Sequence, residues 1–138
     1  MEQVERFGVS MPSALLEQFD SATAEAGYAN RSEAIRDIVR DYLVAREWQD
    51  PEAEVVGTVT IVYDHHARRL DERLTEMQHE HHDAIRCTTH VHLDAQNCIE
   101  VIVVSGTAKL VRHLAEGLIS VKGVKHGRLV TTTTGRSL

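Results

Sequence analysis

The chain of 138 residues lacks a long hydrophobic run, a leader-like N-terminus and an excess of positive charge. No stretch approaches the roughly 18 apolar residues that span a bilayer. The opening MEQVERFGVS has no basic segment followed by an apolar core. We therefore expect a cytoplasmic protein without a membrane partner. A formal net charge of -6 argues against nonspecific coating of nucleic acid, but it leaves room for a small local contact surface.

Cysteine is also scarce, since Cys87 and Cys98 are the two in the chain. So few cysteines in a chain without an export signal are expected to stay reduced rather than to pair. Thiolate metal chemistry is therefore available to both.

The sequence divides at residues 47–54, EWQDPEAE, which are polar and acidic around Pro51. Segments of different periodicity lie on either side, so we interpret 47–54 as a linker between domains 1–46 and 55–138.

In the first domain, residues 5–11 (ERFGVSM) alternate as in one short strand. A helix is predicted from Pro12 to Gly27, and a second begins at Asn30, where Asn-Arg-Ser-Glu matches a capping box. A single strand has no pairing partner and the segment is too small for a sufficient core. Two copies that pair their strands would form a ribbon-helix-helix dimer, whose ribbon enters the DNA major groove.

In the second domain the periodicity predicts four strands, at about 55–63, 84–93, 98–105 and 124–133. It also predicts two helices, at about 67–82 and 107–122, so that the elements follow the order β-α-β-β-α-β. This order matches a ferredoxin-like sandwich, in which two helices cover one face of a four-stranded sheet. The whole chain is thus expected to be an α+β protein.

Residues 90–98, HVHLDAQNC, hold candidate metal ligands. His90 and His92 project from one face of a strand. Cys98 begins the next strand, and Glu100 projects from the same face of that strand as Cys98. An H-x-H pair alone is equally consistent with a metal site and with two exposed histidines on a half-exposed strand. The cysteine across the hairpin favours the metal site. Cys87 should point to the opposite face, and we interpret it as a core residue.

A fourth ligand is expected from QHEHHD, residues 78–83, at the end of the preceding helix. If residues 83–90 form a strand, that helix end lies on the order of 25 Å from His90. A ligand from this segment would then have to come from another subunit across a two-fold axis.

The stretches YANRSEAIRD (28–37), QHEHHD, HVHLDAQNCIEV and GVKHGRLV (123–130) together resemble the nickel-responsive regulators of the NikR type, over nearly the whole chain. The resemblance implies a ribbon-helix-helix domain joined to an ACT-like nickel-binding and tetramerisation domain, in a homotetramer built as a dimer of dimers. It also implies one Ni²⁺ per chain, shared between subunits in square-planar geometry, with His90, His92 and Cys98 from one chain and His79 from its neighbour. Glu100 is expected to orient a ligand or an adjoining helix.

The same resemblance assigns base readout to Arg6, Gly8 and Ser10, although a polar side chain is usual at the position of Gly8. Further DNA contacts are expected at the start of the second helix and beyond it, from Asn30, Arg31, Ser32, Arg36 and Arg68. Arg31 and Arg36 are alternatively solvated helix charges.

Glu33 and Asp37 correspond to a second cation site between the domain types, or are an ordinary exposed acidic pair. The remaining histidines are expected to be surface or capping residues; they are His65, His66, His81, His82, His113 and His126. Of these, His81 and His82 are expected to bind excess metal weakly.

The expected function is that of a nickel-dependent repressor, not an enzyme, which binds a double-stranded palindromic operator of nickel uptake or homeostasis genes. An antitoxin-like DNA-binding module is one alternative, but it predicts a disordered tail in place of the second domain. A metal-dependent enzyme is another, and it needs an open coordination position and a general base, for which Glu100 is the close candidate.

Overall fold

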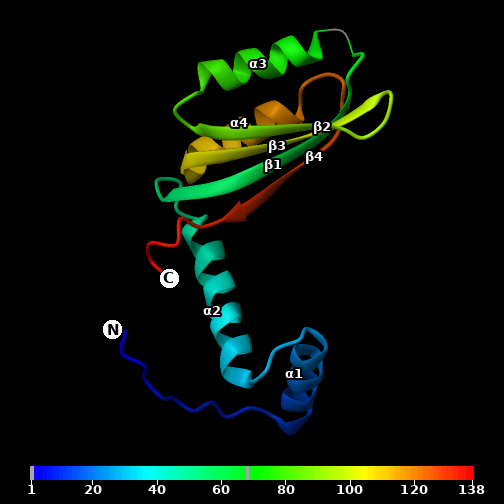
Figure 1. Ribbon diagram of the computed structural model, residues 1–138. Helices are drawn as coiled ribbons and strands as arrows, with labels where there is room; N and C mark the ends of the chain where they lie inside the picture. The colour runs from blue at the N-terminus through cyan, green and yellow to red at the C-terminus, as the bar shows by residue number, and fades with distance from the viewer. Residues whose placement is uncertain (1, 68) are drawn as a thin grey trace. The chain divides into compact units, whose positions relative to one another are not determined.

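The computed structural model describes residues 2–67 and 69–138, and Figure 1 shows its helices and strands. The chain divides into two compact units, one up to Asp41 and one from Tyr42 to Leu138. Each unit is described by itself.

The first unit contains helix α1 (Ser13–Glu25) and the start of helix α2 (Arg31–Glu47). Asn30 caps α2, because its side-chain oxygen accepts a hydrogen bond from the backbone N–H of Glu33 at 2.9 Å. The predicted strand 5–11 does not form in the single chain, where residues 2–12 have no regular secondary structure. A lone strand has no ladder partner, and Phe7 and Val9 accordingly remain 76% and 64% exposed.

The second unit contains β1 (Glu54–Asp64), α3 (Leu70–Glu80), β2 (Ile85–His92), β3 (Asn97–Thr107), α4 (Ala108–Ile119) and β4 (Val124–Thr132). Its four-stranded sheet has the order β2-β3-β1-β4 with antiparallel neighbours. The predicted β-α-β-β-α-β order and the α+β class are confirmed (Figure 1).

Alternate residues of β1 and β3 point into a core beneath α3 and α4, because successive side chains of a strand face opposite sides. The core residues from the strands include Val59, Ile61, Tyr63, Cys98 and Ile102, and those from the helices include Leu70, Leu74, Val111, Leu114 and Leu118.

Cys87 was expected in the core, and this expectation was wrong, because its side chain is exposed in the single chain. Cys87 pairs with Val103, which lies between the buried Ile102 and Val104. It therefore faces the side of the sheet that neither helix covers, as the two-residue period requires.

Trp48 lies within the predicted linker 47–54 yet is only 4% exposed. Its indole N–H donates to the Thr132 carbonyl oxygen at 2.8 Å, and the guanidinium carbon of Arg112 lies 5.1 Å from its ring centroid. The start of the predicted linker is thus part of the core of the second unit, while the domain bounds 1–46, 47–54 and 55–138 stay a prediction.

Thr107 caps α4, since its hydroxyl accepts a hydrogen bond from the backbone N–H of Leu110 at 3.2 Å. We expect Thr107→Ala to lower the free energy of unfolding by about 1 kcal/mol, the usual value of such a cap. Thr107→Ser keeps the acceptor and serves as the control in urea denaturation of the metal-free protein. Equal losses in both variants would show that the cap contributes nothing.

Candidate metal centre

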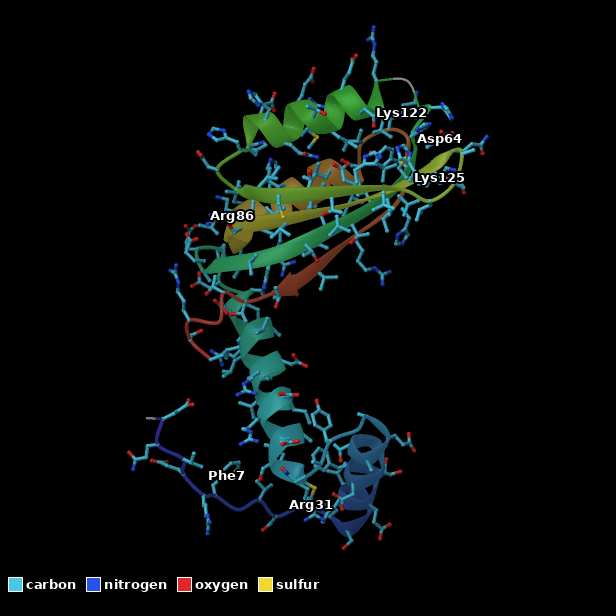
Figure 2. The ribbon with its side chains drawn as sticks, viewed as in Figure 1. Phe7, Arg31, Asp64, Arg86, Lys122 and Lys125 are labelled. Carbon is cyan, nitrogen blue, oxygen red and sulfur yellow. The ribbon has the colours of Figure 1, made fainter. Side chains whose placement is uncertain are left out.

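The register of the sheet brings the predicted ligands together at one end. His92 pairs with Cys98 across the β2–β3 hairpin, and His90 pairs with Glu100. Cys98 also pairs with Tyr63 on β1, so the end of β1 lies beside the hairpin. Figure 2 shows Asp64, the last residue of β1, at this end of the sheet.

Asp94 holds the hairpin turn between these ligands. Its carboxylate accepts hydrogen bonds from the Asn97 side chain and from the backbone N–H groups of Asn97 and Gln96, at 2.7 to 3.2 Å. These bonds lower the pKa of Asp94 to about 2. The turn thus fixes the separation of His92 and Cys98 by hydrogen bonds to a charged group.

His92 and Cys98 form the closest pair of donors, with 3.2 Å between His92 Nδ1 and Cys98 Sγ. Burial, more than the nearby carboxylates of Asp71 and Asp94, raises the pKa of the Cys98 thiol. A metal ion that binds this sulfur must therefore displace its proton.

His65 completes a three-residue cluster with this pair, because donor atoms of His65, His92 and Cys98 all lie within 4.8 Å of one another. His65 was expected to be a surface or capping residue, and the structure places its half-buried side chain beside this pair. His65 follows β1 directly, and its backbone N–H donates to the Gln96 carbonyl oxygen at 2.8 Å. The antiparallel pairing of β1 with β3 brings the end of β1, and His65 after it, to the hairpin, and no local motif indicates this contact.

His90 lies beside the cluster without belonging to it. Its ring centroid is 5.0 Å from that of His92, and its Nδ1 is 3.0 Å from the Tyr63 hydroxyl oxygen. That hydroxyl is 3.3 Å from Glu100 Oε2 and has one proton, so it can donate to Glu100 and accept from a protonated His90 Nδ1. His90 Nε2 would then keep its lone pair for a metal ion.

Burial, and then the Glu100 carboxylate, raise the pKa of Tyr63 well above its ordinary value. The hydroxyl therefore stays protonated and keeps its donor role near neutral pH. Glu100 is itself 7% exposed and accepts a second hydrogen bond from Gln78 Nε2 at 3.0 Å. The predicted orienting role of Glu100 thus has a physical basis, because one carboxylate connects α3 to the residue that holds His90.

His79, next to Gln78 on α3, is exposed and outside the cluster. The separation of about 25 Å expected from the strand length sets only an upper bound. The chain turns back, so that α3 residues Asp71 and Thr75 line a pocket of ≈ 270 Å³ together with His90. Distance alone therefore does not require a second chain, and the assignment of His79 stays a prediction.

The predicted DNA contacts on the first unit are exposed residues, and two of them are engaged in hydrogen bonds within the chain. The Arg31 guanidinium is bound to both carboxylate oxygens of Asp20, at 2.8 and 2.7 Å, and this hydrogen bonding lowers the pKa of Asp20. Asn30 is engaged as the cap of α2. The exposed residues without such contacts among those described are Arg6, Gly8, Ser10, Ser32 and Arg36. Arg68 lies outside the described residues.

The predicted second cation pair, Glu33 and Asp37, lies one turn apart on α2 and belongs to no group of three or more close donors among the described residues. Asp37 accepts hydrogen bonds from the Tyr28 hydroxyl at 2.9 Å and from Arg40 at 3.2 Å. Within residues 2–67 and 69–138, the cluster described above is the group of three or more donors close enough for one metal ion. The described helices include none that is both long and apolar enough to cross a membrane.

Comparisons with known proteins identify the family of each domain. Residues 56–132 match the family model of the NikR C terminal nickel binding domain, and residues 5–46 match that of the ribbon-helix-helix protein, copG family. Relatives named as proposed nickel-responsive regulators occur in Geobacter sp. (strain M21), 58% identical over 100% of this chain and 99% of theirs, and in Thermococcus onnurineus, 54% identical over 99% of each.

An uncharacterized protein from Thermotoga maritima has a solved structure with a TM-score of 0.52 and 16% sequence identity. The likeness covers 58% of this chain and 99% of that chain, and it supports the fold alone.

A ribbon-helix-helix segment followed by a nickel-binding α+β domain defines a nickel-responsive transcription regulator, a DNA-binding protein and not an enzyme. Its site has the thiol and imidazole donors that such a domain requires. The chain belongs to the NikR family, as the match over the second domain and the full-length relatives show. The resemblance that the sequence motifs indicated is confirmed.

Proposed function

We propose that this protein is a cytoplasmic, nickel-dependent transcriptional repressor of nickel uptake or homeostasis genes. The observation that carries the proposal is the arrangement of His90, His92 and Cys98 on one hairpin. Their three donors, together with one further imidazole, make the N₃S set that suits a square-planar Ni²⁺. Zn²⁺ would instead prefer a tetrahedron.

The partner subunit's His79 would supply the fourth donor, in a homotetramer with one nickel ion per chain. The exposure of His79 supports this role, since a ligand to a neighbouring chain must be accessible. The contact of Gln78 with Glu100 also supports it, because it fixes the end of α3 relative to the network that orients His90. Nickel binding would then stabilise contacts between subunits.

On the DNA side, two copies of residues 5–11 would pair as a ribbon and enter the major groove of a palindromic operator. The exposure of Phe7 and Val9 supports pairing, because these side chains need the helices of a dimer for burial. Arg6, Gly8 and Ser10 would face the bases. The proposed phosphate contacts, from the start of α2 and from the segment after β1, are Asn30, Arg31, Ser32, Arg36 and Arg68.

A second cation would bind at Glu33 and Asp37 on α2. Asp37 would have to exchange its hydrogen bonds with Tyr28 and Arg40 for a bond to the cation.

Nickel acts in this proposal by favouring the arrangement in which both DNA-binding dimers engage their half-sites. A ligand shifts such an equilibrium only through its differential affinity for the two states, and DNA must tighten nickel binding by the same factor.

The test uses a duplex selected from a random-sequence library by the nickel-loaded protein. We expect nickel to tighten its binding by about 5-fold to 150-fold or more, measured by fluorescence anisotropy at constant salt. A mutated half-site of the same duplex is the control. Equal affinities with and without nickel would contradict the proposed regulation.

A further inference from the structure

A pocket of ≈ 400 Å³ lies between α4 and the segment that follows α2. Its volume is within the range of small-molecule sites. Its lining residues are Trp48, Gln49 and Pro51 from that segment and Ala108, Lys109, Arg112, His113 and Glu116 from α4. We propose that this pocket binds a small organic anion, whose carboxylate or phosphate group is held by Lys109 and Arg112.

The two sides of the pocket are joined by backbone hydrogen bonds. The Lys109 N–H donates to the Pro51 carbonyl oxygen at 3.0 Å, and the Ala108 N–H donates to the Ala53 carbonyl oxygen at 2.9 Å. These bonds also occupy the first N–H groups of α4, so the binding groups are side chains and not the helix N-terminus. Trp48, on the other side, is part of the core. The pocket thus forms together with the fold, and a ligand has little ordering cost to offset.

The charge of the pocket favours an anion, because Lys109 and Arg112 face one carboxylate, that of Glu116. Within residues 2–67 and 69–138, neither of these two cations takes part in an ion pair, whereas Arg31 and Arg73 do. Both side chains are exposed and therefore accessible to a ligand. In a chain with a formal net charge of -6, this local excess of positive charge attracts small negatively charged molecules.

Arg112 is positioned by Trp48, since its guanidinium carbon lies 5.1 Å from the centroid of the indole ring. A guanidinium held in this way can bind a carboxylate or phosphate group with two parallel hydrogen bonds. Lys109 lies one turn earlier on α4 and adds a point charge. Pro51 and Trp48 supply apolar surface that a bare inorganic ion would leave uncovered, so the lining favours an organic ligand.

The pocket is separate from the metal centre. β3 runs from Asn97, at the hairpin with the metal ligands, to Thr107, directly before α4, and it has 11 residues. At about 3.3 Å per residue, these ends lie roughly 30 Å apart. The proposed anion therefore binds without contact to the metal ligands, and the inference does not rest on the proposed nickel site.

Trp48 is the one tryptophan of the chain, so its fluorescence reports directly on this pocket. The test titrates the full-length protein with glycerol phosphate and, separately, with succinate, and sodium chloride at equal ionic strength is the control. We expect a saturable change with glycerol phosphate if the ligand class is a phosphate, and with succinate if it is a carboxylate. Calorimetry measures the same affinities without use of the indole.

Arg112→Gln removes the charge and the paired donors, and it is expected to weaken binding by about 10-fold to 100-fold, as for the loss of hydrogen bonds to a charged group. Arg112→Lys keeps the charge alone and should lie between this variant and the wild type. Lys109→Gln should also weaken binding, and it leaves the contact of Arg112 with Trp48 in place. Arg73→Gln, at an exposed arginine on the other helix, is the matched control and should bind as the wild type does.

The absence of saturable binding for both probes would overturn the inference. So would an equal affinity of Arg112→Gln, Lys109→Gln and Arg73→Gln, in samples whose thermal unfolding matches that of the wild type. Nickel titration of the same variants keeps the two proposals apart, because all of them should bind nickel as the wild type does. A wild type that binds no nickel would contradict the nickel site and leave the result for the anion unchanged.

Discussion

Replacement of Cys98 by alanine is expected to abolish the nickel–thiolate charge-transfer band and to weaken nickel binding by more than about 100-fold. Cys98 is the one sulfur in the cluster, and the other described cysteine, Cys87, lies outside it. The absorption spectrum of the nickel-loaded variant measures the first effect, and competition with a chelator measures the second.

The chain offers a matched control for this experiment in its other cysteine. Cys87 is exposed and faces the opposite side of the same sheet, so Cys87→Ala should keep both the band and the affinity. Cys98 is fully buried, and its truncation also costs core packing of about 1 kcal/mol. Urea unfolding of the metal-free variant separates that cost from the loss of a ligand. A band that survives Cys98→Ala would refute the site.

Mixing two inactive variants is expected to restore nickel sites if the ligand from α3 crosses between subunits. His79→Ala and Cys98→Ala should each bind nickel more than about 100-fold more weakly than the wild type. In a co-refolded equimolar mixture, a chain with Cys98 can meet a partner with His79. Random pairing then restores about a quarter of the sites, because each partner is the required variant half of the time.

The recovered band intensity measures this outcome, and unmixed samples of each variant at the same concentration are the control. If His79 instead serves the site of its own chain, no pairing of the two variants rebuilds a complete ligand set. A mixture without recovery, in subunits shown to have exchanged, would therefore contradict the shared site.

Much of the second domain could be predicted from local pattern. The alternation in 55–63 and 98–105 reports burial of every second residue, and Leu110, Val111, Leu114 and Leu118 recur at the helical period. The convergence of His92 and Cys98 followed from the two-residue period and a short turn, which are local properties as well. The predicted strand 5–11 could not be confirmed in this way, because it has no pairing partner within its own chain and is not formed there.

The sequence by itself determined the family, the element order of the second domain and the pair formed by His92 and Cys98, since each depends on residue types at short spacing. Only the tertiary structure decided that His65 joins this pair, that Tyr63 and Glu100 orient His90, that α3 returns over the sheet and that Cys87 is exposed. These features depend on which strands are neighbours and which face the helices cover. Such contacts join residues far apart in the chain, and no local periodicity encodes them.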